Sequence, residues 1–151
     1  MVGIRLEEGL NSPILILQEL DTPLRVVELW IGAVEAGAIA FAQQGLTPPR
    51  PMTHELLLQT VAALGSSIQS VAVTELREGT FYAELNLSNG IKVSARPSDA
   101  VALAVHAECP IYVAESVFEV AGKPSGAEVA EDDQIEEFRE FLENLSPEDF
   151  A

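Results

Sequence analysis

The chain repeats one pattern of predicted elements twice, and this repetition limits the folds open to it. Three strand-like segments precede an alanine-rich helix over residues 2–44, and the same order returns over residues 68–107. At an offset of 64, residues 35–40 (EAGAIA) align with residues 99–104 (DAVALA). We therefore predict an α+β fold built from two β3-α pseudo-repeats with mixed or antiparallel sheets, with an extra helix inserted between them.

The boundaries of the predicted elements follow from apolar periodicity and from turn residues. The dipeptides Glu78-Gly79 and Asn89-Gly90 mark hairpin turns, and three prolines over residues 47–51 exclude a helix or a central strand there. We expect strands at 2–8, 13–20, 24–31, 68–73, 80–87, 91–95 and 110–114, and helices at 33–44, 54–64, 99–107 and 115–121.

The C-terminal part differs from the rest in composition. Residues 122–133 are rich in Gly, Pro, Ser, Ala and acids, which predicts a mobile linker. Apolar residues then recur at helical spacing over 134–149, opposite a row of glutamates, which predicts an amphipathic helix. We therefore expect a folded domain over 1–121, a linker over 122–133 and a terminal helix that docks on the domain, on a neighbouring subunit or on another protein.

The charge is strongly acidic, at −16 with 8 basic and 24 acidic residues. The chain has no basic run of the kind that neutralises nucleic-acid phosphates, so any RNA or DNA binding is expected to be weak. The longest apolar stretch, residues 29–42, is 14 residues long and contains Glu35, whereas a membrane span needs about 20. With a single cysteine, Cys109, and no secretory signal pattern, a cytoplasmic location is expected.

Two segments place an arginine and a proline just before a hydroxyl residue at a predicted helix start. They are Arg50-Pro51-Met52-Thr53 and Arg96-Pro97-Ser98, with Thr53 and Ser98 as the expected N-caps. Free backbone N–H groups at a helix start together with a guanidinium suit phosphate or carboxylate, so Arg50, Arg96, Thr53 and Ser98 are candidate substrate-binding residues. The alternative is that each arginine pairs with one of the chain's own carboxylates.

Carboxylates and a histidine lie at the same helix starts. His54 is a candidate general base, while Glu35, Glu55 and Asp99 offer the oxygen ligands that Mg²⁺ or Mn²⁺ takes. A structural role is the alternative for each of them, because an acid in the first turn favours the helix dipole and a first-turn histidine is often exposed. His106, near a predicted helix end, is assigned no role.

Residues 13–122 resemble the bifunctional nuclease (DNase/RNase) domain family of bacteria and plants. The matching motifs occur in family order: WIG at 30–32, EA at 35–36, AIA at 38–40, RP at 50–51, THELL at 53–57, GTFYA at 79–83, ARPSDA at 95–100 and PIYVAE at 110–115. One departure is Ser94, since family members often carry an acid before the ARPSDA motif.

The resemblance implies an α+β fold, self-association and cleavage of both DNA and RNA. Joined to the candidate residues, it suggests a metal-assisted nuclease in which Glu35 and Asp99 hold Mg²⁺ or Mn²⁺, with Glu55 as a further ligand. His54 would act as base, and Arg50 and Arg96 would bind phosphate. The alternative is a non-catalytic regulatory module that binds an anion or a partner. Apolar surface and sheet edges left over from two three-stranded units predict a homodimer.

Overall fold

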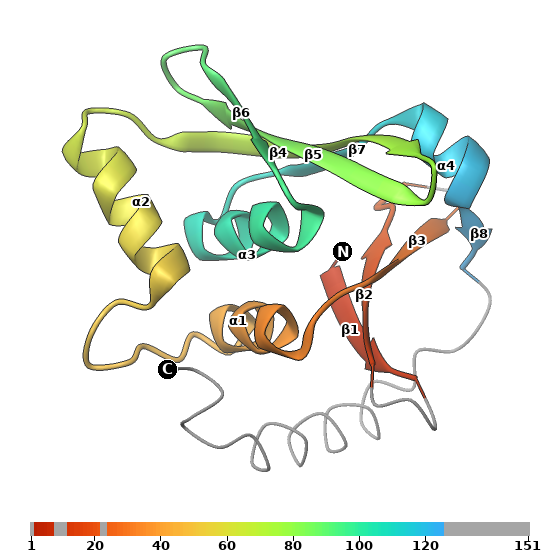
Figure 1. Ribbon diagram of the computed structural model, residues 1–151, viewed down its shortest axis with the longest axis horizontal. Coiled ribbons are helices and arrows are strands. Elements are labelled where there is room, and N and C mark those ends of the chain that lie inside the picture. Colours follow the sequence, from red (N-terminus) through yellow and green to blue (C-terminus); the bar gives the residue numbers. More distant parts are fainter. Residues whose placement is uncertain (1, 8–11, 22–23, 126–151) are drawn as a thin grey trace. The chain divides into compact units, whose positions relative to one another are not determined.

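The computed structural model describes residues 2–7, 12–21 and 24–125, which divide between two compact units. The described residues of the first unit are 2–7, 12–21, 24–37 and 122–125, and the second unit comprises residues 38–121. Helix α1 (Ala33–Gln43) starts in the first unit and ends in the second. The elements of both units are labelled in Figure 1. The expected α+β class is confirmed, with four helices and two four-stranded sheets in the described residues.

The first unit contains an antiparallel sheet in the order β1-β2-β3-β8. Its strands are β1 (Val2–Leu6), β2 (Pro13–Gln18), β3 (Arg25–Trp30) and β8 (Lys123–Pro124). The predicted hairpin between the second and third strands is confirmed, with Leu15 opposite Leu29. The apolar run of β2 explains its central place, because Ile14, Leu15, Ile16 and Leu17 are all buried.

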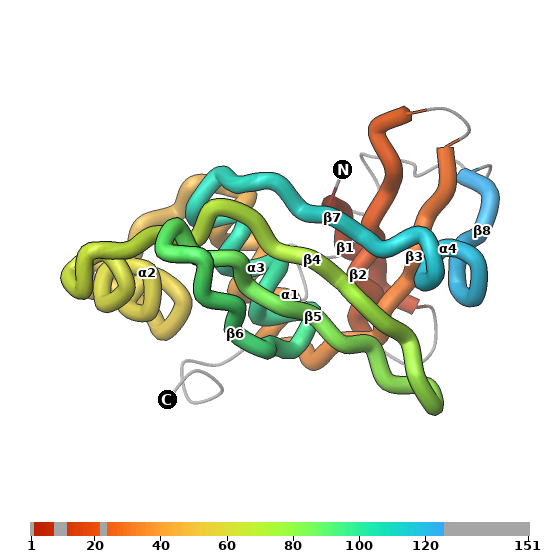
Figure 2. The backbone as a smooth tube through the Cα atoms, turned by 90° about the horizontal axis from the view of Figure 1, so that it is seen from above, coloured from red at the N-terminus to blue at the C-terminus, as the bar shows by residue number. Residues whose placement is uncertain are grey.

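The second unit contains a mixed sheet in the order β6-β5-β4-β7, which Figure 2 shows side by side. Its strands are β4 (Ile68–Arg77), β5 (Thr80–Leu87), β6 (Lys92–Ala95) and β7 (Ile111–Val113), and β7 runs parallel to β4. The β4–β5 turn has positive φ at both Glu78 (50°) and Gly79 (76°), as a two-residue hairpin with the twist of its strands requires.

Three helices belong wholly to the second unit: α2 (Thr53–Ala63), α3 (Pro97–Ala107) and α4 (Glu115–Ala121). Helix α3 packs on β4 and β5 and also contacts α2 (Figure 1). Its run from Ala100 to Ala104 is fully buried against inward-facing residues such as Val71 and Leu85, so small side chains permit close helix–sheet packing. Helix α2, in contrast, has no buried residue.

The element order β-β-β-α occurs twice along the chain, over β1 to α1 and over β4 to β6 with α3, but the fourth strand of each sheet joins differently. Strand β8 pairs with the third strand of its sheet, whereas β7 pairs with the first strand of the other. An internal duplication therefore stays a prediction. Lys123 and Pro124, at the start of the expected linker, pair with β3. The remainder of that linker, from residue 126, and the expected helix at 134–149 lie outside the described residues.

Candidate active site

The start of α3 places Asp99 and Arg96 on the same turn. Arg96 is extended (φ −69°, ψ 143°), Pro97 occupies the first helical turn, and Ala100 N–H donates to the Arg96 carbonyl at 3.0 Å. The expected N-cap at Ser98 is therefore wrong, since Arg96 holds that position. Proline explains the earlier start, because its fixed φ suits the first helical residue and it lacks an N–H that would need a partner. Ser98 lies inside the helix and is 7% exposed.

The start of α2 is also one residue earlier than predicted. Met52 is the N-cap, so the expected N-cap at Thr53 is wrong and Thr53 is the first helical residue. Met52 has no side-chain oxygen for the free N–H groups, but Glu55 folds back and accepts the Met52 backbone N–H at 3.1 Å. This bond fixes the first turn, which carries His54 and Glu55.

His54, Asp99 and Arg96 form a connected cluster at these two helix starts. His54 Nε2 lies 3.1 Å from Asp99 Oδ1, and Arg96 Nε donates to Asp99 Oδ2 at 2.8 Å. Burial of Asp99 opposes its ionisation, but the hydrogen bonds from Arg96 and His54 outweigh burial and lower the pKa of the Asp99 carboxyl. The carboxylate is therefore an acceptor at neutral pH, and a hydrogen bond to it requires a proton on His54 Nε2.

This arrangement leaves Nδ1 of His54 with the lone pair of the neutral ring. A histidine oriented by a carboxylate is a common general base, because the carboxylate selects the tautomer and stabilises the imidazolium that forms. The His54 side chain is 17% exposed, so it is partly shielded. The alternative of an internally paired arginine is realised for Arg96, whose side chain is nevertheless 66% exposed beside Asp99.

A second histidine–carboxylate pair lies on the same two helices. His106 Nδ1, near the end of α3, is 4.0 Å from Glu55 Oε1 on α2. Burial lowers the pKa of His106, the nearby Glu55 charge opposes this effect, and the His54 charge adds to it. His106 is therefore mainly neutral at pH 7. The adjacent residues His54 and Glu55 of α2 thus face opposite ends of α3, His54 at Asp99 and Glu55 at His106.

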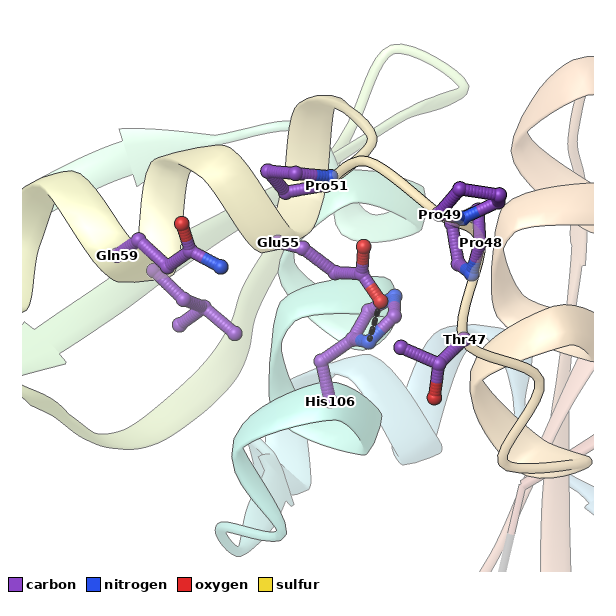
Figure 3. Close-up of a pocket in the computed structure, with 8 residues that line it drawn as sticks. Thr47, Pro48, Pro49, Pro51, Glu55, Gln59 and His106 are labelled. Carbon is purple, nitrogen blue, oxygen red and sulfur yellow. Dashed lines mark ion pairs between the residues drawn. The ribbon is translucent and has the colours of Figure 1, made fainter.

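A pocket of about 460 Å³ opens beside this second pair (Figure 3). Its apolar lining consists of Pro48, Pro49, Pro51 and Leu58. Its polar lining consists of Thr47, Glu55, Gln59 and His106. In Figure 3, the side chains of Glu55 and His106 point toward one another, with Thr47 and the prolines of the connector nearby. The volume lies within the range of small-molecule sites.

The remaining predicted site residues are Arg50 and Glu35. Arg50 lies between two pocket-lining prolines, is exposed, and forms no hydrogen bond or ion pair within the described part of the chain. Glu35 lies in the first turn of α1 and belongs to the other unit. Its carboxylate packs against Gly32, so that a Cβ at position 32 would collide with Glu35 Oε2.

The expected metal ligands are Glu35, Glu55 and Asp99. Among residues 2–7, 12–21 and 24–125, no group of three or more His, Cys, Asp or Glu side chains is arranged to hold a metal ion. Asp99 and Glu55 are each engaged in a two-residue pair with a histidine instead. Within the described residues of the second unit, Glu55 and Asp99 therefore form no three-ligand cation site.

Sequence reasoning missed His106 and Gln59 as pocket residues, although one signal pointed to Gln59. Glu55, Leu58 and Gln59 follow the spacing i, i+3, i+4, so they share one face of α2 directly after a rigid proline segment. That spacing indicates one face of a helix, but His106 lies 47 positions after Gln59 and so falls outside any such pattern. Only the packing of α2 on α3 brings it to the pocket.

Comparison with known proteins identifies the family of the chain. The family model of the bifunctional nuclease domain matches residues 15–126. Two relatives from Mycobacterium tuberculosis, the uncharacterized protein MT1877 of strain CDC 1551 / Oshkosh and the uncharacterized protein Rv1829 of strain ATCC 25618 / H37Rv, are each 46% identical over 157 aligned positions. Each alignment covers 99% of this chain and 95% of the relative. The cluster of His54, Asp99 and Arg96 lies within the matched region.

Proposed function

Because the chain belongs to the bifunctional nuclease domain family, we propose that it hydrolyses phosphodiester bonds in RNA and DNA at the cluster of His54, Asp99 and Arg96. The observation that carries this proposal is the 3.1 Å contact between His54 Nε2 and Asp99 Oδ1. It supplies an oriented base beside an exposed guanidinium, and both functions are needed to attack a phosphate.

In the proposed reaction, His54 Nδ1 accepts a proton from water as the water oxygen bonds to phosphorus. The bond from phosphorus to the leaving oxygen breaks, and the imidazolium returns the proton to that oxygen. Asp99 holds the ring and stabilises its charged form. Arg96, with Arg50 as a second cation, stabilises the charge that develops on the phosphate oxygens. In RNA the 2′-hydroxyl can replace water as nucleophile.

The experiment compares cleavage of labelled single-stranded RNA and DNA by the wild type, His54→Ala, Asp99→Asn and a control, Gln69→Ala. Gln69 is exposed on β4 and outside the site. We expect His54→Ala and Asp99→Asn to lose about 10²–10⁴-fold in rate, the usual contribution of general-base catalysis. Cleavage that persists unchanged in both variants would contradict the proposal and indicate another site or a contaminant.

A non-catalytic anion-binding module is the second candidate function, and the Arg96–Asp99 ion pair favours it. An arginine held by a carboxylate at 2.8 Å presents less charge to a substrate than an unpaired one. This alternative predicts binding of a small anion and no cleavage of RNA or DNA by either the wild type or Asp99→Asn.

We also propose that the protein forms a homodimer and acts in the cytoplasm. Exposed apolar residues of α2 and of its C-cap support self-association: Leu56 and Leu57 are 54% and 41% exposed, and the C-cap Leu64 is 81% exposed. Light scattering at about 10 μM tests it, because a monomer at that concentration places the Kd above this range.

The unpaired Cys109 is compatible with a reducing compartment. No helix of the described ranges has the length and apolar character needed to cross a bilayer.

A further inference from the structure

We infer that the pocket beside Glu55 and His106 binds a nucleobase carrying an exocyclic amino group, adenine or cytosine, and so selects where the chain is cleaved. This inference rests on the proposed function, because it gives the nuclease site a neighbouring base-recognition subsite. Its starting observation is that His54 and Glu55 are consecutive residues of α2, one facing Asp99 and the other facing the pocket.

The shape and lining of the pocket suit a flat heterocycle. A volume of about 460 Å³ is at the lower end of small-ligand sites, enough for a base and its sugar. Pro48, Pro49 and Pro51 are held by the stiff connector, and together with Leu58 they offer rigid apolar surface to the faces of a ring. Such a pre-formed wall loses little conformational entropy when a ligand binds.

The polar groups of the pocket specify the hydrogen-bonding edge. The Glu55 carboxylate only accepts hydrogen bonds when ionised, and Oε2 already accepts the Met52 N–H at 3.1 Å. The Gln59 amide both donates and accepts. The Glu55 carboxylate can therefore accept from the exocyclic amino group of a base, while the Gln59 amide donates to the neighbouring ring nitrogen. Adenine and cytosine carry these two groups side by side on their Watson–Crick edges. Uracil and hypoxanthine present a carbonyl oxygen where those bases present the amino group, and Glu55 would repel it.

Arg50 supplies the complementary charge for a phosphate at this site. It lies between the lining residues Pro49 and Pro51 and forms no ion pair within the ranges that the structure describes. Arg50 is not itself a lining residue, but from its place between Pro49 and Pro51 we expect its guanidinium to reach the phosphate of a nucleotide whose base contacts Glu55. The opposite charges of Glu55 and Arg50 orient the nucleotide within the pocket.

The test measures nucleotide binding by the full chain with two matched ligand pairs, CMP against UMP and AMP against IMP. Within each pair an amino group is exchanged for a carbonyl oxygen. Two-dimensional NMR titration of the backbone amides gives both the Kd and the location of binding. We expect a Kd on the order of 1 mM for CMP and AMP, about 5–10-fold weaker binding of UMP and IMP, and shifts concentrated at residues 47–59 and 106.

Three variants assign the roles within the pocket. Glu55→Gln keeps an acceptor for the Met52 N–H but adds a donor, so the preference for CMP over UMP should disappear, whereas the control Glu119→Gln on α4 should retain it. Gln59→Ala should weaken binding of CMP. Arg50→Ala should weaken CMP but leave cytidine, which has no phosphate, unchanged. Gln59 and Glu119 are exposed, so their substitution leaves the core intact.

Two outcomes would overturn the inference. The first is equal affinity for CMP and UMP in the wild type. The second is binding of ribose 5-phosphate, which lacks a base, as tight as that of CMP. These ligands contain no phosphodiester, so the result is independent of cleavage: failure of the cleavage experiment with intact CMP selectivity would overturn the proposed nuclease reaction and leave the base pocket standing.

Discussion

Asp99 Oδ1 lies 3.1 Å from His54 Nε2, and this contact joins the first turn of α3 to the first turn of α2. The other oxygen of Asp99 accepts Arg96 Nε, so one carboxylate orients both a base and a cation. The usual view of an acid in the first helical turn is that it stabilises the helix dipole. Asp99 has this position as well, but its two hydrogen bonds give it a specific task in the proposed reaction.

The titration of His106 provides a first prediction. Burial and the His54 charge lower its pKa, while Glu55 raises it. In a pH titration followed by NMR, the His106 ring should have a midpoint below about 6.5, the usual value for histidine. Glu55→Gln should lower that midpoint further because the opposing carboxylate is lost, and His54→Ala should raise it. Shifts of opposite sign would contradict the assigned neighbours.

A second prediction concerns Glu28 on β3, which accepts Arg5 Nη2 from β1 and Lys123 Nζ from β8, each at 2.8 Å. The hydrogen bond from Lys123 is the main cause that lowers the pKa of Glu28, and the Arg5 charge adds to it against the effect of burial. Glu28→Gln should reduce the free energy of unfolding by about 1–2 kcal/mol at pH 7.

The sign of the pH dependence follows from the lowered pKa of Glu28. The stabilisation is fully present above the unfolded-state pKa of about 4.3 and is lost as the pH falls through the folded-state value. Urea unfolding should therefore show a difference between wild type and Glu28→Gln that shrinks as the pH is lowered from 7 to about 3. A difference that stays constant over this range would show that Glu28 acts through packing instead.

The third prediction concerns Gly32 and Glu35. A Cβ at position 32 would collide with Glu35 Oε2, so Gly32→Ala forces the Glu35 side chain to move. We expect Gly32→Ala to destabilise the protein by roughly 0.5–2 kcal/mol, and by clearly less in a Glu35→Ala background. Thermal melts of the two single variants and the double variant measure this coupling. Additive effects would mean that the Glu35 side chain moves aside without loss of stability.

The fourth prediction concerns the cation. A requirement for Mg²⁺ or Mn²⁺ held by Glu35, Glu55 or Asp99 stays a prediction, and the described residues do not gather three such ligands. If His54 is the base in the absence of a metal, RNA cleavage through its own 2′-hydroxyl should survive EDTA. DNA cleavage, in which His54 takes the proton from water, should survive EDTA as well. Equal loss on both substrates would favour a metal-dependent reaction throughout.

A fifth prediction follows from the charge of residues 126–151, which lie outside the described part of the chain. Ten acids and one base give this segment −9. Its deletion should increase nucleic-acid affinity or cleavage at low salt, because the segment repels phosphates. The gain should fade as salt is added, since the range of this repulsion falls to about 10 Å at 0.1 M salt. A lower melting temperature with no gain in binding would instead indicate that the segment contributes to folding.

The sequence by itself determined the elements and their class, because these depend on local signals. Apolar alternation predicted β5, turn dipeptides predicted the hairpins, and the alanine-rich run at 33–44 predicted α1. The N-caps at Thr53 and Ser98 were wrong because hydroxyl preference is a tendency, whereas Pro97 at the start of α3 and the backbone bond of Glu55 to Met52 set the helix starts. The family motifs also identified His54 and Asp99.

The contacts between site residues that are distant in the sequence follow from the tertiary structure alone. His54 and Asp99 are 45 positions apart, and Glu55 and His106 are 51 apart, so no periodicity relates either pair. Their contacts depend on how α2 packs against α3, and that packing depends on side chains throughout the second unit. The same packing opened the pocket beside the proline connector, whereas the pair of Arg96 and Asp99 is local, three residues apart at the start of α3. Long-range packing is a property of the whole core, which is why short sequence windows do not contain it.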